Sequence, residues 1–379
     1  MAQAPDFDAD MPLARVVELM ATPNLEPRVY SLCAARLARA CAADRDAVVR
    51  VGAIPLLMDA LTRHAGEAGV CKSVCLALGN IAAGSDAHRD AVAGAIPQLV
   101  VALARHAGEA GVCKSACSAL GNIAVHSDAH RDACVVAGAI PCLVGALARH
   151  AADAVVCWAA CIAINNVTLT SNAHRDACVA EGAIPLLVGA LSRHAGEAGV
   201  CNFASRALAN FMAESDAHRN ACVAAGAVPL FAGALARHAG VAGVCHSVSC
   251  ALGNLALEGD AHRDACEAAG AVPLLKSALE RHAGEAGVCQ TVNVALKNIA
   301  AGSDARCAAS VAAGAAGSDA RCAASAPAGA TPAPSDALPG NDAASPVAAL
   351  AKVGNPGRGP LLLALCVIFY LIAVFRGWQ

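Results

Sequence analysis

The chain has 379 residues, a net charge of −3 and only 15% charged residues, so it has no broad electrostatic field of the kind that coats DNA or binds a polyanion. Hydrophobic residues make up 57% of the sequence and aromatic residues only 3%, which predicts a core of small side chains within Ala- and Leu-rich helices. We therefore expect no nucleic-acid partner.

The N-terminal residues 1–26 are predicted to be a flexible segment. The first 25 of them lack the basic start and the apolar run of a signal peptide, so the 20 cysteines are not expected to form a secreted disulfide framework. Most cysteines recur at equivalent places of a repeat, where Ala or Val stands in other copies. This substitution pattern is typical of a small buried hydrophobic residue in a reducing compartment.

One phrase recurs along the chain at a nearly constant spacing. The tetrapeptide Gly-Ala-Ile/Val-Pro begins at six glycines, with one spacing of 42 residues and four of 44: Gly52, Gly94, Gly138, Gly182, Gly226 and Gly270. An Arg-His pair and an Ala-Leu-Gly-Asn-Ile-like stretch keep the same period. Self-similarity at this period is typical of stacked structural repeats. The sequence therefore predicts six copies of one unit.

Each copy is predicted to contain three helices. In one copy, Ser127 or Asp128 can cap a short first helix, because a side-chain oxygen accepts an unpaired N–H of the first turn. Gly138 then ends that helix, and Pro141 lies near the first turn of the second, where its missing N–H costs nothing. Residues 155–168 carry apolar side chains on more than one face, as a buried third helix needs.

A short, a medium and a long helix in 42 to 44 residues, with Gly-Ala-Ile-Pro between the first two, resembles the armadillo repeat of β-catenin and importin-α. The resemblance implies an all-α fold, a right-handed α-solenoid of about six three-helix repeats. It covers residues 27–302. We expect an N-terminal cap helix at 27–41, followed by repeats at about 42–85, 86–127, 128–171, 172–215, 216–259 and 260–302.

In armadillo proteins the third helices line a concave groove, and a late Asn binds the backbone of an extended partner peptide. The resemblance therefore implies a ladder of binding residues: Asn80, Asn122, Asn166, Asn210, Asn254 and Asn298. The amide suits this role because it offers both a donor and an acceptor to a peptide unit. The alternative is that each Asn only ties its helix to the neighbouring copy.

Comparison among the copies suggests where specificity lies. The residues eight and four before each Asn, and four after it, share its helix face and vary, whereas the residue three before it is Ala in all six copies. A varying stripe on a copied scaffold indicates a recognition surface, with drift at exposed sites as the alternative. The predicted specificity residues are Lys72, Lys114, Trp158, Phe203, Arg206 and His246. The Trp that importin-α carries four residues before the Asn is absent.

No constellation of catalytic residues stands out from the repeat background, so we expect no enzyme, no metal, no cofactor and no small-molecule substrate. Eleven of the thirteen histidines recur at fixed repeat positions and are expected to be structural. A cation near a helix C-terminus interacts favourably with the dipole, which accounts for the set that ends the second helices. Cysteine pairs four residues apart, such as Cys71 and Cys75, leave a thiol-based metal or redox sensor as a less favoured alternative.

The C-terminal part has a different composition. Residues 303–358 are rich in Ala, Gly, Ser and Pro and predict a low-complexity, disordered linker. Residues 359–379 contain a fully apolar stretch from Leu361 to Phe375, including Phe369 and Tyr370, which predicts a transmembrane tail anchor. A segment so close to the C-terminus resembles those of tail-anchored proteins, and this implies a single-pass membrane protein whose repeats face the cytosol. The alternative is a buried C-terminal helix that caps the solenoid.

These observations predict a non-enzymatic scaffold or adaptor. It would bind an extended peptide segment of a partner protein in the groove and display it at the cytosolic face of a membrane. The main alternative is a soluble, importin-like carrier of linear signals.

Overall fold

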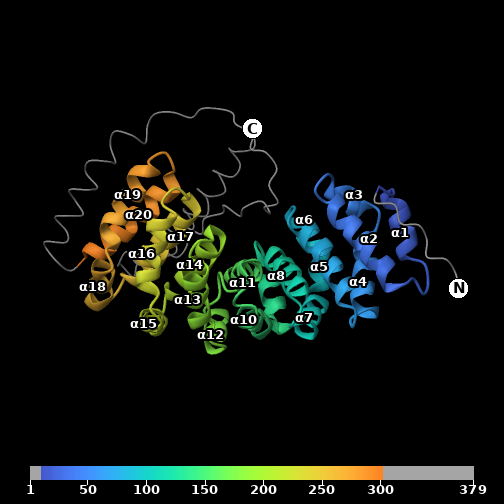
Figure 1. The fold of residues 1–379 in the computed structure, drawn as a ribbon, viewed down its shortest axis with the longest axis horizontal. Coiled ribbons are helices and arrows are strands. Elements are labelled where there is room, and N and C mark those ends of the chain that lie inside the picture. The colour runs from blue at the N-terminus through green and yellow to red at the C-terminus, as the bar shows by residue number, and fades with distance from the viewer. Residues whose placement is uncertain (1–9, 302–379) are drawn as a thin grey trace, which may run out of the picture. The chain divides into compact units, whose positions relative to one another are not determined.

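The computed structural model describes residues 10–301, which form twenty α-helices and one short 3-10 helix and contain no strand. The predicted all-α array is confirmed over this part of the chain. The predicted linker at 303–358 and membrane segment at 359–379 lie outside the described residues. The copies follow one another in chain order, from the blue helix α2 to the orange helix α20 (Figure 1).

Each copy has three helices of increasing length. The first helices are α3 (Arg45–Arg50), α6 (Asp86–Val92), α9 (Asp128–Val136), α12 (Asn172–Ala180), α15 (Asp216–Ala224) and α18 (Asp260–Ala268). The second helices are α4 (Ala53–Arg63), α7 (Ile96–Arg105), α10 (Ala139–Arg149), α13 (Ala183–Arg193), α16 (Ala227–Arg237) and α19 (Ala271–Arg281). The third helices are α5 (Ala68–Ala82), α8 (Ala110–Ala124), α11 (Ala154–Val167), α14 (Ala198–Met212), α17 (Ala242–Leu255) and α20 (Ala286–Ala300).

The predicted punctuation marks determine where these helices begin and end. Ser127 caps α9 by accepting a hydrogen bond from the backbone N–H of His130 at 3.3 Å. Gly138 takes a φ of +81° between α9 and α10, a conformation that favours glycine. Gly94 differs, because its copy is two residues shorter and the chain enters α7 through the 3-10 helix η1 (Ala93–Ala95) instead.

The N-terminal segment is more ordered than predicted. Within the expected flexible residues 1–26, helix α1 (Leu13–Met20) buries Val16, Leu19 and Met20. The hydroxyl of Tyr30, in helix α2 (Pro27–Ala40), donates to the carbonyl of Met20 at 3.1 Å. The apolar residues of α1 recur at three- and four-residue spacing, which is the signal of an amphipathic helix that the prediction of flexibility overlooked. Helix α2 forms as expected and packs on α5 as a third helix does.

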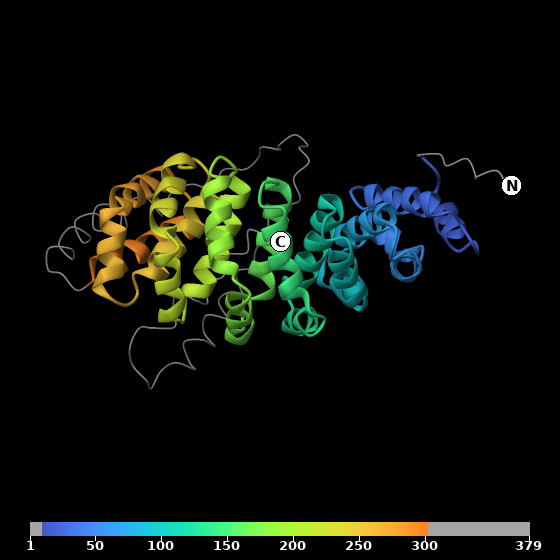
Figure 2. The same ribbon diagram turned by 60° about the horizontal axis from the view of Figure 1, so that its bottom comes forward.

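The third helices form the interior of the array. They pack in sequence, α2 on α5, α5 on α8 and so on to α20, and successive helices lie side by side in both views (Figures 1 and 2). The Ala three residues before each ladder Asn is fully buried in all six copies: Ala77, Ala119, Ala163, Ala207, Ala251 and Ala295. A side chain of one carbon at this place allows the helices to approach closely.

Glycine on the facing helix makes the closest approaches possible. A Cβ added to Gly121 of α8 would lie 3.2 Å from Cα of Ala163 in α11. The same approach occurs at Gly79 against Ala119, at 3.3 Å, and at Gly253 against Ala295, at 3.4 Å. Because the opposing atom is backbone, it cannot rotate away as a side chain would.

The sixth copy has polar residues on its outward face. Glu267 stands where the preceding copies carry Val or Ala, and Lys276 where they carry Met, Val or Ala. Asn293 stands where they carry Cys or Ser, and Lys297 where they carry mainly Gly. At the positions of Asn293 and Lys297, the residues of the five preceding copies are buried. Asn293 and Lys297 themselves are exposed. A polar outer face is what a terminal repeat of a solenoid needs for solubility.

Within residues 10–301, no single helix combines the length and the apolar character needed to cross a bilayer. Two bent pairs, α9 with α10 and α15 with α16, meet those criteria jointly, by length and composition alone.

We expect Gly121→Val to destabilise the array, because its branched side chain has to push α11 away from α8. Overpacking of this kind costs roughly 1–3 kcal/mol in free energy of unfolding. Gly145→Ala in α10 is the control, since a Cβ there meets no atom within 4 Å. It is expected to be neutral or to stabilise by up to about 1 kcal/mol through helix propensity. Denaturant unfolding followed by circular dichroism measures both, and equal stability of the two variants would contradict the close approach.

Candidate peptide-binding surface

The residues eight and four positions before each ladder Asn form a continuous accessible face, which we call the third-helix surface. Its members are Lys72, Leu76, Lys114, Ser118, Trp158, Ile162, Asn202, Arg206, His246, Cys250, Gln290 and Val294. None of the twelve is buried, and Lys72, Leu76, Lys114 and Gln290 are exposed. The residues that differ among copies are therefore in contact with solvent, while the invariant Ala of the same helices is inside.

The ladder asparagines lie between the copies. The amide nitrogen of Asn166 donates to the carbonyl of Gly121 in the preceding third helix at 3.0 Å. Asn80, Asn122, Asn254 and Asn298 make the same bond, to the carbonyls of Ala38, Gly79, Ala209 and Gly253, at 2.9–3.0 Å. These contacts are the ones that the alternative interpretation of the ladder requires. That the ladder asparagines bind a peptide backbone stays a prediction. Such binding would use the amide N–H and oxygen that the bond between copies leaves unused.

The junction between α11 and α14 departs from this pattern. Asn165 replaces the small residue that precedes the ladder Asn, and its amide oxygen accepts the amide N–H of Asn210 at 3.0 Å. Asn165 in turn donates to the amide oxygen of Asn166 at 2.8 Å. All three side chains are buried, so this is an internal polar chain whose members satisfy one another.

Trp158 lies across the junction between the third and fourth copies. A Cβ added to Gly199, near the start of α14, would meet Cδ1 of the Trp158 indole at 2.9 Å. Two other residues at this position make the same contact: Lys72 lies against Gly111 and Asn202 against Gly243. Each of these side chains is thus laid over a glycine of the following helix, which fixes its position while leaving part of it accessible.

Two groups of the expected specificity residues do not belong to this surface. Phe203 is only 9% exposed and is part of the core, because seven residues are nearly two full helical turns and place it on the same face as the buried Asn210. Two of the residues four after an Asn, Thr170 and Glu214, bond to the residue that begins a first helix. Thr170 donates to Asp128 at 2.5 Å, and Glu214 accepts from the amide of Asn172 at 2.7 Å.

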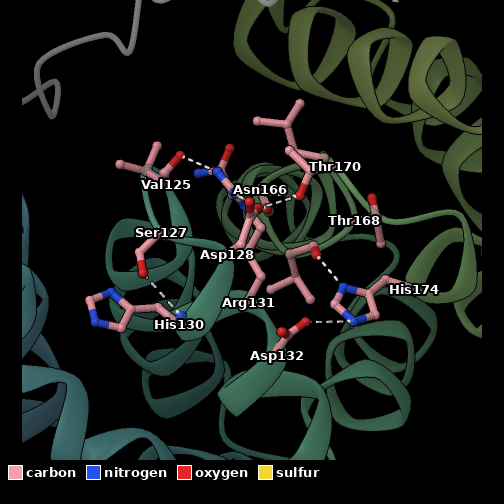
Figure 3. Close-up of polar contacts among 12 residues, drawn as sticks. Val125, Ser127, Asp128, His130, Arg131, Asp132, Asn166, Thr168, Thr170 and His174 are labelled. Atoms are coloured by element: carbon pink, nitrogen blue, oxygen red, sulfur yellow. Dashed lines mark hydrogen bonds and ion pairs between the residues drawn. The ribbon is translucent and has the colours of Figure 1, made fainter. Parts of the chain in front are cut away.

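An arginine recurs in every first helix and joins successive copies, a role that was not predicted from the sequence. Arg131 donates from Nε to the carbonyl of Asn166 at 3.0 Å and from a terminal nitrogen to the carbonyl of Val125 at 2.6 Å, and it pairs with Asp128 (Figure 3). It therefore joins the C-terminal ends of two successive third helices. Arg219 is the most buried of the set, at 1% exposed. The available signal was an arginine at one repeat position in all six copies: Arg45, Arg89, Arg131, Arg175, Arg219 and Arg263.

The histidines of the first helices link neighbouring copies, as a structural role requires. Nε2 of His174 lies 3.2 Å from Oδ1 of Asp132 in the preceding copy, and Nδ1 lies 3.2 Å from the carbonyl of Val167 (Figure 3). Corresponding pairs join Asp46 to His88, Asp90 to His130, Asp176 to His218 and Asn220 to His262.

The histidines that end the second helices also reach the preceding copy, which adds to the expected dipole interaction. Nε2 of His150 lies 2.8 Å from the carbonyl of Ala107, and His106, His194, His238 and His282 repeat this contact at 2.8–2.9 Å. A ring N–H at each junction thus satisfies a carbonyl that the turn after a second helix would leave unpaired.

The cysteines have a local structural role. Each third helix begins with a cysteine whose thiol lies within hydrogen-bonding distance of the carbonyl that ends the second helix, as for Cys113 and His106 at 3.6 Å. Burial raises the pKa of Cys134 to about 12, and it raises the pKa of Cys117 well above the ordinary value. Buried thiols of this kind are poor nucleophiles. Within residues 10–301, no three metal-ligating side chains lie together.

We expect Asn166→Ala to lower the stability of the array, because the buried carbonyl of Gly121 loses its donor. The cost of such an unsatisfied group is about 1–3 kcal/mol in free energy of unfolding. Gln290→Ala in α20 removes an exposed amide of the same kind and should change that free energy by less than about 0.5 kcal/mol. Denaturant unfolding followed by circular dichroism compares them. An Asn166→Ala protein as stable as the wild type would show that the bond between copies contributes nothing.

Comparison with known proteins agrees with this architecture. Residues 41–83 match the family model of the Armadillo/beta-catenin-like repeat. No curated protein matches the chain. Among solved structures, an engineered protein superposes with a TM-score of 0.56 at 27% identity, covering 80% of this chain and 82% of the other.

Designed proteins with the named repeat are also similar. A designed armadillo repeat protein in complex with the peptide (KR)4 has a TM-score of 0.54 at 26% identity, covering 65% of this chain and 99% of its own. A computationally designed armadillo repeat protein for modular peptide recognition has a TM-score of 0.54 at 25% identity, with the same coverage. The described repeats therefore have the armadillo fold, and residues 41–83 carry a match to the family's own sequence model.

Proposed function

We propose that this protein is a non-enzymatic adaptor that holds an extended segment of a partner protein along the third-helix surface. One observation carries the proposal. The twelve positions of this surface vary among copies and are accessible, although the helices around them repeat the same buried residues at the same places. Stability accounts for the repeated residues, and a ligand would account for the variation on this face, for which drift at exposed sites is the alternative.

The spacing of the helices suits an extended ligand. Packed helices lie about 8–10 Å apart, and an extended chain advances roughly 3.3 Å per residue. Each copy would thus present its two varying side chains to about three residues of the bound segment. Trp158 and Arg206 are of the residue types that most often dominate binding energy, and they stand on neighbouring third helices.

The structural neighbours support this function. One designed armadillo protein is described in complex with a peptide, and another was made for modular peptide recognition. The fold of the described repeats is that of these binders, which makes an extended peptide the favoured partner for this chain. The soluble, importin-like carrier remains a second candidate because it needs the same surface.

Membrane display is a second part of the proposal, and the sequence alone supports it. The apolar stretch from Leu361 to Phe375, with Phe369 and Tyr370, would anchor the chain, and residues 303–358 would tether the repeats at the cytosolic face. Such an anchor would hold the captured partner close to that membrane.

Selection from a displayed library of random 12-residue peptides tests the binding function. The immobilised full chain is expected to enrich recurring peptide families. Because truncating a dominant contact costs about 2 kcal/mol or more, Trp158→Ala and Arg206→Ala should each weaken an enriched peptide roughly thirtyfold. Fluorescence anisotropy of the labelled peptide measures the affinity.

Matched controls come from outside the surface. Val101 in α7 and Val136 in α9 are exposed, and Val101→Ser and Val136→Ser should leave the affinity unchanged. Circular dichroism confirms that each variant keeps its helix content. Failure to enrich any peptide family, or equal losses in the control variants, would refute peptide binding on the third-helix surface.

Carbonate extraction tests the anchor. The full chain expressed in eukaryotic cells should stay in the membrane pellet at alkaline pH and leave it only with detergent, because 15 consecutive apolar residues keep their place in the bilayer. A chain that lacks residues 359–379 should be released. Release of the full chain by carbonate without detergent would rule out membrane integration and favour the soluble carrier.

A further inference from the structure

The first-helix histidines that reach back to the preceding copy do not all meet the same partners. Three of them, His130, His174 and His218, face an acceptor at each ring nitrogen. Nδ1 lies 3.1–3.2 Å from the backbone carbonyl seven residues earlier, and Nε2 lies 3.2–3.4 Å from a carboxylate oxygen of the preceding copy. Figure 3 shows both contacts for His174. The three side chains are only 11–13% exposed, so water has little access to either nitrogen.

A neutral imidazole cannot satisfy both of these partners. It carries a single N–H, so whichever nitrogen holds the proton, the lone pair of the other points at an oxygen that has no hydrogen to donate. Protonation of both nitrogens removes this repulsion, because Nδ1–H then donates to the carbonyl and Nε2–H faces a group of opposite charge. The geometry at these three junctions therefore favours the imidazolium ion.

The two outer junctions have the same histidine but do not need the charge. At the first, Nδ1 of His88 accepts the backbone N–H of Ser85 at 3.1 Å, while Nε2 donates to Asp46 at 2.9 Å, so one proton is enough. At the last, Nε2 of His262 lies 2.9 Å from the side-chain amide of Asn220, which replaces the carboxylate of the inner copies. Because an amide can turn its NH2 group toward a bare ring nitrogen, this junction is also complete with a neutral ring.

Asp132 is the carboxylate that faces His174, and the other charged groups beside the ring are engaged with different partners. On α9, Asp128 and Arg131 pair with each other. On α12 itself, Arg175 donates to two backbone carbonyls. Helix α11, whose last residue supplies the carbonyl to Nδ1, contains no charged residue.

Helices α10, α13 and α14 also pack on α12. Their charged residues are Arg149 and Arg193, which end the second helices, and Arg206 on the third-helix surface. Glu214, which follows α14, accepts a hydrogen bond from Asn172 at the start of α12.

His130 and His218 have corresponding surroundings. Their carboxylates are Asp90 and Asp176, and the helices that supply their carbonyls, α8 and α14, each carry one charged residue, on the third-helix surface. The arginines of the adjoining first helices have polar partners within their own helix: Arg89 with Asp86, Arg131 with Asp128, Arg175 with Asn172 and Arg219 with Asp216.

We propose that His130, His174 and His218 are proton-dependent links, which make the junctions from the second to the fifth copy more stable in mild acid than in mild base. Their contribution is complete where the ring is protonated, and it is lost as the pH rises through the range in which histidine ordinarily titrates, about 6.5. The array thus has a pH-responsive middle between two end junctions that keep a neutral ring. This property does not depend on whether the array binds a peptide.

Substitution of the carboxylates tests the links without removing the rings. Asp132→Asn builds the amide of the last junction into an inner one, and a triple variant adds Asp90→Asn and Asp176→Asn. Asp46→Asn is the matched control, because it makes the same change at the same repeat position beside His88, which needs one proton only. Thermal unfolding of the full chain is followed by circular dichroism at about pH 5.5 and about pH 8, a range in which exposed carboxylates stay ionised.

At about pH 5.5 the triple variant should melt about 2 °C or more below the wild type. The shift is modest because the three carboxylates are 68–71% exposed and solvent screens each pair. At about pH 8 the difference should close, since an amide N–H can then serve the bare nitrogen of a neutral ring. Asp46→Asn should show no difference that grows with acid.

Asp132→Asn alone should change in the same direction as the triple variant, so a triple variant that fails to fold still leaves a decisive comparison. A variant that melts below the wild type by the same amount at both pH values would overturn the proposal, because the contacts would then be neutral hydrogen bonds. An equal acid-dependent loss in Asp46→Asn would overturn it as well, since the effect would come from any carboxylate at this repeat position.

Discussion

The close contact between successive third helices is the constraint on which the rest of the structure depends. Gly79, Gly121 and Gly253 face a buried Ala of the next helix at distances that leave no room for a Cβ. Because the backbones approach so closely, the amides of five of the six ladder Asn reach a backbone carbonyl of the preceding third helix. The small residues and the Asn thus lie at the same contact, and the junction where Asn165 replaces the small residue is the one whose ladder Asn bonds a side chain instead of the backbone.

This arrangement separates stability from recognition. Arg and His residues of the first helices, His residues of the second helices and the Asn of the third helices each make a bond from one copy to the next. The copies are thus fastened on several sides by recurring residues, and the positions eight and four before each Asn vary among copies that keep the same helices. Under the proposed function, substitutions at these twelve positions would change the ligand and leave the contacts between copies in place.

Periodicity predicted most of the fold, since six glycines at a spacing of 42 to 44 residues determine where helices end and how many copies there are. It failed where a feature occurs only once. Helix α1 has no counterpart in the repeats, and Phe203 is a single large residue at a position that is otherwise small. The role of each Asn could not be predicted from the sequence either, because the distance between adjacent helices decides whether its amide reaches the neighbouring copy. The repeated Arg was visible in the sequence, but its burial depends on how first and third helices pack.

The polar outer face of the sixth copy has a consequence for how such an array can change in length. Glu267, Lys276, Asn293 and Lys297 occur only in that copy, and α1 and α2 occur only at the other end. Unequal recombination between inner copies would add or remove a unit and leave both ends as they are. Under the proposed function, each such step would lengthen or shorten the bound segment by one copy and supply a new pair of surface positions free to diverge.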